Sequence, residues 1–152
     1  MASKLDKSMR GAVGKVLVDY AKPLKEMIQA GKYNWVNDNI TSDHFPTTGT
    51  GQKEVEITLF HFNRPISSDD AIAEMEKAGY RPADPPEILA LGAEHPELQK
   101  QFPIVALGSP WRNPDGDRSV LYLDWLISGR RLDLILFEAD WYEDYRFAAV
   151  RK

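Results

Sequence analysis

The stretch that decides the fold runs from Val120 to Phe137 and reads Val120-Leu-Tyr-Leu-Asp-Trp-Leu-Ile-Ser-Gly-Arg-Arg-Leu-Asp-Leu-Ile-Leu-Phe137. Residues 120–126 and 132–137 alternate with the two-residue period of a β-strand, and Trp125 takes a core position in the first run. Ser128 and Gly129 supply a turn between the two runs, which predicts a hairpin. Both faces of this hairpin carry apolar side chains, so we expect the sheet to be covered on both sides.

The predicted hairpin belongs to a mostly antiparallel sheet in the C-terminal half of the chain. Ile104–Leu107 and Tyr145–Val150 are two further strand candidates, and Asn113–Asp117 supplies another turn. Glu54–Phe62, rich in β-branched and aromatic residues, predicts an earlier strand that ends before Pro65. Residues 41–51 carry turn-forming residues throughout and read as a loop.

Residues 4–30 predict an amphipathic N-terminal helix, because apolar residues recur there at three- and four-residue steps. Ser3 is the expected N-cap, Gly31 the expected stop, and Pro23 should kink or divide the helix. The apolar positions are Leu5, Met9, Ala12, Val13, Val16, Leu17, Tyr20, Leu24, Met27 and Ile28.

Short central helices are predicted after three capping signals. The segment from Ser67 opens one helix, the Asp84–Pro85 pair opens a second that runs to Leu91, and His95–Pro96 opens a brief third. The predicted fold class is therefore α+β, with an N-terminal helical arm over residues 1–31 and a single α+β domain over residues 32–152.

Composition excludes several classes of chemistry. The 152 residues include no Cys, which removes disulfides, zinc–thiolate sites, iron–sulfur clusters and cysteine nucleophiles. Charged residues interrupt the N-terminus, so no apolar signal core is seen, and no run is long enough to span a membrane. We expect a cytoplasmic protein without a membrane partner.

Charge is distributed unevenly along the chain. Residues 1–35 hold seven basic and three acidic residues, and the remainder holds 12 basic and 20 acidic ones, so a +4 arm precedes a −8 body. The arm is compatible with a helix packed on the body, with a homo-oligomerisation helix, or with a nucleic-acid-binding face. That basic face would consist of Lys4, Lys7, Lys15, Lys22 and Lys25.

Side chains that could carry catalysis are sparse. His44, His61 and His95 are widely spaced and match no zinc-protease motif, and no nucleotide loop or nucleophile elbow is present. A small metal-dependent hydrolase that uses His61 with Asp140 and Asp144 stays an alternative, provided that these residues converge. No cofactor or metal is assigned.

Aromatic and charged residues gather in two C-terminal loops, a combination typical of binding surfaces. Asn113, Asp115 and Asp117 are also explained by a turn between strands. The leading interpretation is a non-catalytic protein that binds an unidentified protein or small molecule through these loops. The candidate binding residues are Trp111, Arg112, Asn113, Asp115, Asp117, Asp140, Trp141, Tyr142 and Asp144.

Residues 80–151 resemble the C-type-lectin-like core of formylglycine-generating-enzyme-like proteins. The resemblance is carried by Tyr80-Arg-Pro-Ala-Asp-Pro-Pro-Glu-Ile-Leu89, Val105-Ala-Leu-Gly-Ser-Pro-Trp111 and Tyr145-Arg-Phe-Ala-Ala-Val-Arg151. It covers under half of the chain. The enzymes of that family use cysteines that this chain lacks, so the resemblance implies a binding role and transfers no ligand residue.

Overall fold

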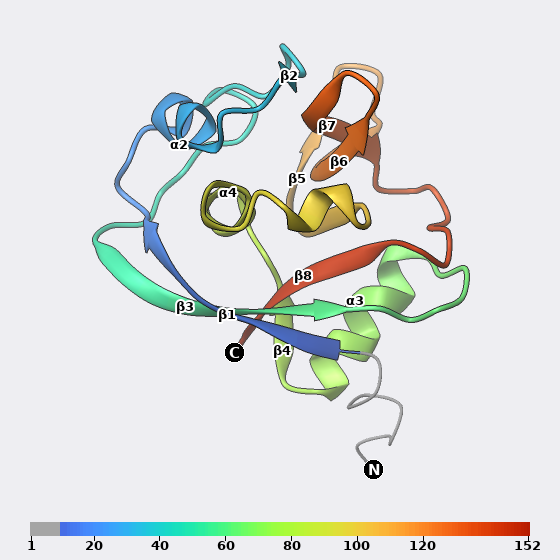
Figure 1. Cartoon of the computed structure of the whole chain (residues 1–152). Coiled ribbons are helices and arrows are strands. Elements are labelled where there is room, and N and C mark those ends of the chain that lie inside the picture. The colour runs from blue at the N-terminus through green and yellow to red at the C-terminus, as the bar shows by residue number, and fades with distance from the viewer. Residues whose placement is uncertain (1–9) are drawn as a thin grey trace.

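The computed structural model describes residues 10–152, which form one eight-stranded mixed sheet accompanied by helices (Figure 1). The strands are β1 (Arg10–Asp19), β2 (Trp35–Val36), β3 (Gln52–Phe60), β4 (Tyr80–Pro82), β5 (Ile104–Arg112), β6 (Arg118–Leu126), β7 (Gly129–Leu136) and β8 (Arg146–Arg151). The helices are α2 (Leu24–Gly31), α3 (Ser68–Lys77), α4 (Pro85–Glu94) and the 3-10 helix η1 (Leu98–Lys100).

The sheet has the order β1-β3-β8-β5-β6-β7-β2, and β4 pairs with β8 beyond the two residues that pair with β5. The prediction of a mostly antiparallel sheet confined to the C-terminal half is wrong in two respects. β5 pairs parallel to β8 and β2 pairs parallel to β7, and β1 and β3 from the N-terminal half belong to the same sheet. The two-residue alternation of apolar side chains identified the strands. It does not tell whether a neighbouring strand runs parallel or antiparallel.

The predicted N-terminal helix is also wrong, because residues 10–19 form β1. Their pattern fits a strand as well as a helix: Val16 and Val18 point into the core and Leu17, between them, is exposed. Gly14 has φ +118°, at a bulge where the register with β3 shifts. A residue with a positive φ disfavours a helix, whereas pairing with β3 provides hydrogen-bond partners for the backbone N–H and C=O groups.

The helical part of the predicted arm is short. α2 begins directly after Pro23, and its C-cap is Lys32 in the left-handed conformation, one residue beyond the predicted stop. Pro23 therefore starts the helix instead of kinking it, as expected of a residue with a fixed φ and no backbone donor. Residues 20–23 form the turn between β1 and α2, and the other predicted helical residues, 4–9, lie outside the described residues.

The capping signals of α3 and α4 lie where the sequence placed them. Ser67 accepts a hydrogen bond from the Asp70 amide, and Asp84 and Glu87 form a reciprocal capping box. Glu87 is buried; its carboxylate also accepts two hydrogen bonds from Arg81 and one from the Tyr20 hydroxyl. α4 is thus fixed to β4 and to the end of β1.

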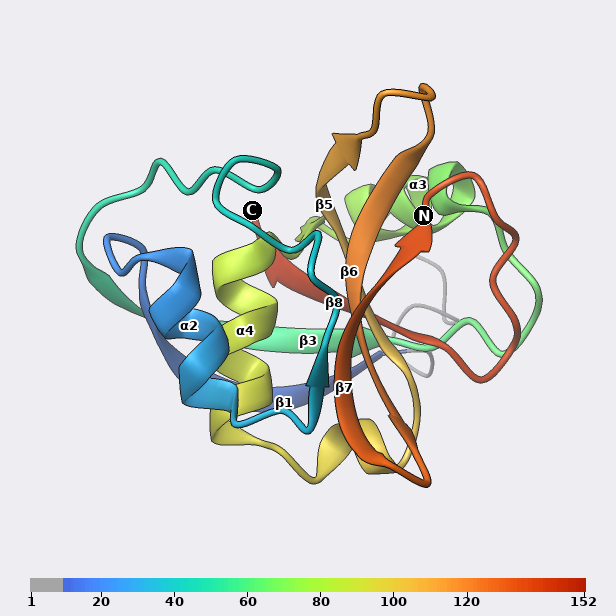
Figure 2. The same cartoon turned by 90° about the horizontal axis from the view of Figure 1, so that it is seen from above.

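Two apolar cores lie on opposite faces of the curved sheet. α4 lies within the concave side with α2 beside it, and α3 covers the other face (Figures 1 and 2). The α4 side includes Ile88, Leu89 and Leu91 packed with residues of β1, β3, β5, β6, β7 and β8. The α3 side includes Met75 and Trp141. The expectation that the sheet is covered on both faces is confirmed.

In residues 10–152 we find no helix with the length and apolar character needed to cross a membrane.

Candidate functional site

The end of the β6–β7 hairpin carries exposed apolar side chains. Leu126 pairs with Gly129, so Ile127 and Ser128 form the turn. Trp125 is 49% exposed, Leu126 is 48% exposed, and Ile127 is fully exposed. Three consecutive large apolar residues at a turn are unusual in a soluble domain unless they contact a partner, because turn positions are ordinarily polar.

Trp35 extends this surface across β7. β2 pairs with β7 so that Trp35 lies opposite Arg131, and the Arg131 guanidinium lies 5.3 Å from the centre of the Trp35 ring. Trp35 is 44% exposed. Leu126 faces the same side of the sheet as Trp35, because Asp124, two residues earlier, pairs with Arg131; Trp125 faces the opposite side, and Ile127 lies at the turn between the two faces. We call Trp35, Trp125, Leu126 and Ile127 the apolar hairpin end.

A buried polar network holds the turn end of this hairpin. Arg130, only 8% exposed, donates to the Gly31 and Gly92 carbonyls at the ends of α2 and α4, and its Nε donates to Gln99 Oε1 at 3.1 Å. The Gln99 amide nitrogen in turn donates to the Asp124 and Arg131 carbonyls at 2.8 and 3.0 Å. The apolar side chains are therefore presented on a rigid support, which reduces the entropy lost on binding.

The charges beside the apolar hairpin end are paired. Arg131 forms two hydrogen bonds to the Asp124 carboxylate, at 2.9 and 3.0 Å, and approaches Asp133 at 3.4 Å. Burial, followed by the charges of Asp124 and Asp133, raises the pKa of the neighbouring Tyr122 to about 12, so this phenol is neutral at physiological pH. The flank of the site is a group of one basic and two acidic side chains, not a basic cluster.

The predicted Trp111–Asp117 loop lies at the opposite end of β6 from the apolar hairpin end (Figure 2). Trp111 is half-buried and stacks on His44 with ring centres 3.8 Å apart. Arg112 donates to the Gly116 carbonyl, and the Asn113 side chain accepts from the Asp117 amide. Asp115 and Asp117 are exposed. The polar residues of this loop thus form its turn, and its binding role stays a prediction.

The predicted Asp140–Asp144 segment is divided between core and surface. Trp141 is 1% exposed, and its indole donates to Ser68 Oγ at 2.8 Å, so it is not accessible to a partner in this conformation. Tyr142 is 73% exposed, and Asp140 and Asp144 are exposed as well. The segment therefore offers a partner one aromatic side chain, Tyr142, instead of two.

His61 does approach this segment, but through the backbone: its Nε2 lies 2.8 Å from the Glu143 carbonyl. Across the described part of the chain, no three His, Asp or Glu side chains form a group that could hold a metal ion. His61, Asp140 and Asp144 therefore form no metal centre within residues 10–152, and the convergence that the hydrolase alternative requires is not found there.

The basic residues proposed for nucleic acid do not share a helix face. Lys15 lies on β1, Lys22 lies in the connection to α2, and Lys25 lies on α2. Lys4 and Lys7 lie outside the described residues. The single helical face that motivated the nucleic-acid hypothesis is therefore absent from residues 10–30.

Sequence reasoning missed three members of the apolar hairpin end and assigned the fourth, Trp125, to the core. A signal was present, since Ile127 directly precedes Ser128 and Gly129 and so makes the turn itself apolar. The alternation of side chains within the hairpin distinguishes the two faces of its strands. It does not tell how far the end of the hairpin projects beyond the elements that cover those faces.

Comparison of the chain with protein-family models, with curated proteins and with solved structures finds no match. Its function is therefore inferred from its own side chains.

Proposed function

We propose that this protein is a non-catalytic interaction module that inserts its apolar hairpin end into an apolar cleft of a partner protein. The observation that carries the proposal is the exposure of Trp125, Leu126 and Ile127 in succession on a rigidly held hairpin. Trp is enriched among the residues that dominate binding energy, and full burial of one Ile or Leu side chain contributes about 1.5–3 kcal/mol.

A protein partner fits this surface better than an anionic membrane. The net charge of the chain is −4, and the cation beside Trp35, Arg131, forms ion pairs with both Asp124 and Asp133. Peripheral membrane binding draws on unpaired basic clusters, whereas an apolar centre with a polar rim of both signs is typical of protein interfaces.

Leu126 and Leu136 provide a matched pair of variants. Both are leucines of the β6–β7 hairpin, 48% and 47% exposed, but Leu136 pairs with Ser119 at the opposite end of the ladder. Leu126→Ser should reduce partner affinity by about tenfold or more, and Leu136→Ser should leave it unchanged.

The test has two stages. The full chain and both variants are first used to isolate associated proteins from cells that produce this chain, and the candidate partner is then titrated as a purified protein by calorimetry. Specific loss with Leu126→Ser supports the proposal. Equal affinity of the wild type and Leu126→Ser, or equal loss in both variants, would refute it.

A further inference from the structure

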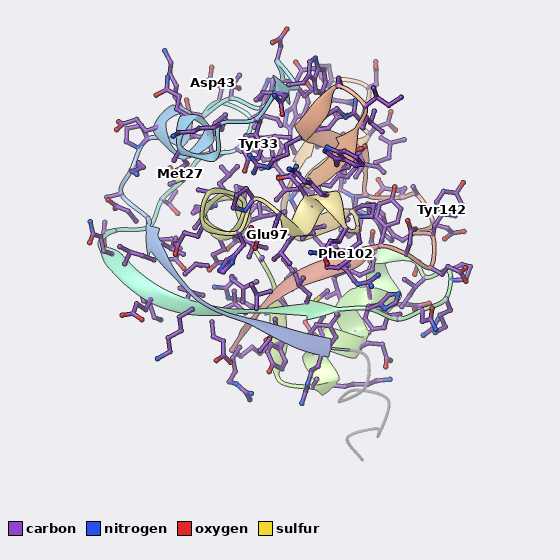
Figure 3. All side chains as sticks on the ribbon, in the orientation of Figure 1. Met27, Tyr33, Asp43, Glu97, Phe102 and Tyr142 are labelled. Atoms are coloured by element: carbon purple, nitrogen blue, oxygen red, sulfur yellow. The ribbon has the colours of Figure 1, made fainter. Side chains whose placement is uncertain are left out.

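A groove of about 540 Å³ lies beside the N-terminal half of β1. Its other walls include residues around η1 and the first residue of β8, Arg146. Leu59, Leu98 and Phe102 give it an apolar surface, and His61, His95 and Arg146 add nitrogen donors. Phe102 and Glu97 mark this region beside η1 and β8 in Figure 3, and Tyr142 lies away from it at the edge of the view. Its volume is that of a small-molecule site.

Arg146 differs from the other arginines held within this fold. Arg81, Arg118 and Arg131 each pair with a carboxylate. Arg146 is half-buried, lies 4.2 Å from the centre of the Phe102 ring, and donates one hydrogen bond, to the Asp144 carbonyl. Among the ion pairs of residues 10–152, none includes Arg146.

A guanidinium removed from water without an anion is unfavourable, and such groups are ordinarily paired. Burial accordingly lowers the pKa of Arg146, and the charge of Asp144 opposes this effect without cancelling it. Arg130 is more deeply buried than Arg146, and its charge is compensated differently. Backbone and side-chain oxygens accept hydrogen bonds from its Nε and from both of its terminal nitrogens. The Arg146 guanidinium can thus bind an anion.

The two imidazoles have a free nitrogen each. His61 uses Nε2 for the Glu143 carbonyl, which leaves Nδ1 without a partner in the described chain. His95 Nδ1 lies 3.7 Å from Glu97 Oε1, beyond hydrogen-bond distance, and its Nε2 has no partner within residues 10–152. A neutral imidazole has one N–H. In His61 that N–H is on Nε2 and donates to the Glu143 carbonyl, so the His61 Nδ1 is an acceptor; the His95 ring can donate a hydrogen bond to an oxygen ligand.

We propose that this groove binds a small organic monocarboxylate, whose carboxylate pairs with Arg146 and accepts from the His95 imidazole, and whose apolar body lies on Leu59, Leu98 and Phe102. Glu97 on the rim supplies one negative charge, and Arg10, which also lines the groove, directs its guanidinium over the Tyr80 ring. Because Glu97 lies in the same lining, it repels a ligand with two negative charges more strongly than a ligand with one.

The test uses benzoate as the probe and benzyl alcohol as its uncharged counterpart, titrated to millimolar concentration into the full chain and followed by NMR. Benzoate is expected to shift the ring signals of His61, His95 and Phe102, and benzyl alcohol to shift them much less. Phenyl phosphate, which carries more negative charge, should bind more weakly than benzoate. No shift with benzoate, or equal affinity for benzoate and benzyl alcohol, would overturn the assignment.

Substitutions test which charged side chain binds benzoate. Arg146→Gln should weaken benzoate by about tenfold, the loss expected for a charge-assisted hydrogen bond. Arg64→Gln, at an exposed loop position, removes the same charge outside the groove and should have no effect. Glu97→Gln should strengthen binding, because it removes the opposing charge.

If Arg146→Gln does not fold, Arg146→Lys takes its place; it keeps the charge but loses the planar fork, and should bind benzoate more weakly than the wild type. Unchanged affinity in the folded Arg146 variant, or equal losses with Arg64→Gln, would show that this cation does not hold the anion. These results are independent of Leu126 and of the proposed protein partner.

Discussion

Replacing Arg130 with Met is expected to lower the free energy of unfolding by about 4 kcal/mol. The guanidinium donates to the Gly92 carbonyl at 2.7 Å, to the Gly31 carbonyl, and to Gln99 Oε1 at 3.1 Å, and it lies 4.8 Å from the centre of the Tyr33 ring. Each buried acceptor left without a donor costs about 1–3 kcal/mol. Relief of the buried charge offsets part of that total, and Met fills most of the volume of the arginine stem.

Urea unfolding followed by circular dichroism measures this loss directly. With a slope of about 2 kcal/mol per molar urea, the midpoint should fall by about 2 M. Arg131→Met provides the comparison at the next position. The Arg131 guanidinium is less deeply buried than that of Arg130, and its carboxylate partners Asp124 and Asp133 retain some contact with water, so the loss should be smaller than for Arg130→Met. Arg130→Lys should lie between the wild type and Arg130→Met, because it keeps the charge without the planar set of donors.

An Arg130→Met midpoint within experimental error of the wild type would refute the reasoning, as would equal losses for Arg130→Met and Arg131→Met. The first result would mean that water reaches the two helix ends once the guanidinium is gone. The second would mean that the hairpin depends on total positive charge and not on these particular acceptors.

Three further predictions concern other buried or edge contacts. Glu94 Oε2 accepts a hydrogen bond from the Leu17 amide at 2.8 Å on the unpaired edge of β1. Glu94→Ala should expose this edge and increase self-association, measured by light scattering at several concentrations; an unchanged mass would contradict this prediction. Burial opposes ionisation of Glu87, but hydrogen bonds, chiefly from Arg81, outweigh this effect and lower its pKa from 4.5. The wild type should therefore lose stability as the pH falls below about 4.5. Glu87→Gln should be less stable than the wild type at pH 7 but should lose less stability over that pH range in urea titrations. Burial raises the pKa of Tyr33 to about 12, and its hydroxyl has no hydrogen-bond partner within residues 10–152, so stability should fall between pH 10 and 12. Tyr33→Phe should match the wild type at pH 7 and exceed its stability above pH 10 in thermal melts; parallel pH curves would exclude this explanation.

The sequence predicted the helices that are defined by side-chain chemistry. α3 and α4 begin at capping groups whose hydrogen bonds involve residues three positions away, and such local bonds leave a readable pattern. β1 is the opposite case. Its segment, Arg10-Gly-Ala-Val-Gly-Lys-Val-Leu-Val-Asp19, satisfies helical and strand periods together, and its partner β3 lies more than 30 residues away in the chain. Pairing over that distance decided between the two periods.

The candidate sites were harder to predict because exposure is a property of the assembled fold. Trp125 and Trp141 both looked like members of aromatic runs, yet Trp141 donates to Ser68 in the α3-side core, whereas Trp125 projects where the hairpin extends beyond its cover. The groove depends on Leu59, Leu98 and Arg146, which are far apart in the sequence and have no common motif.

The 3-10 helix η1 connects the two surfaces to which we assign functions. Leu98 lines the groove beside Arg146, and the adjacent Gln99 holds the Asp124 and Arg131 carbonyls of the hairpin as well as the Arg130 Nε. A displacement of η1 that enlarged the groove would have to stretch or break these three hydrogen bonds. Because buried polar networks resist partial loss of their partners, the same bonds that hold the apolar hairpin end also limit how far the groove can open.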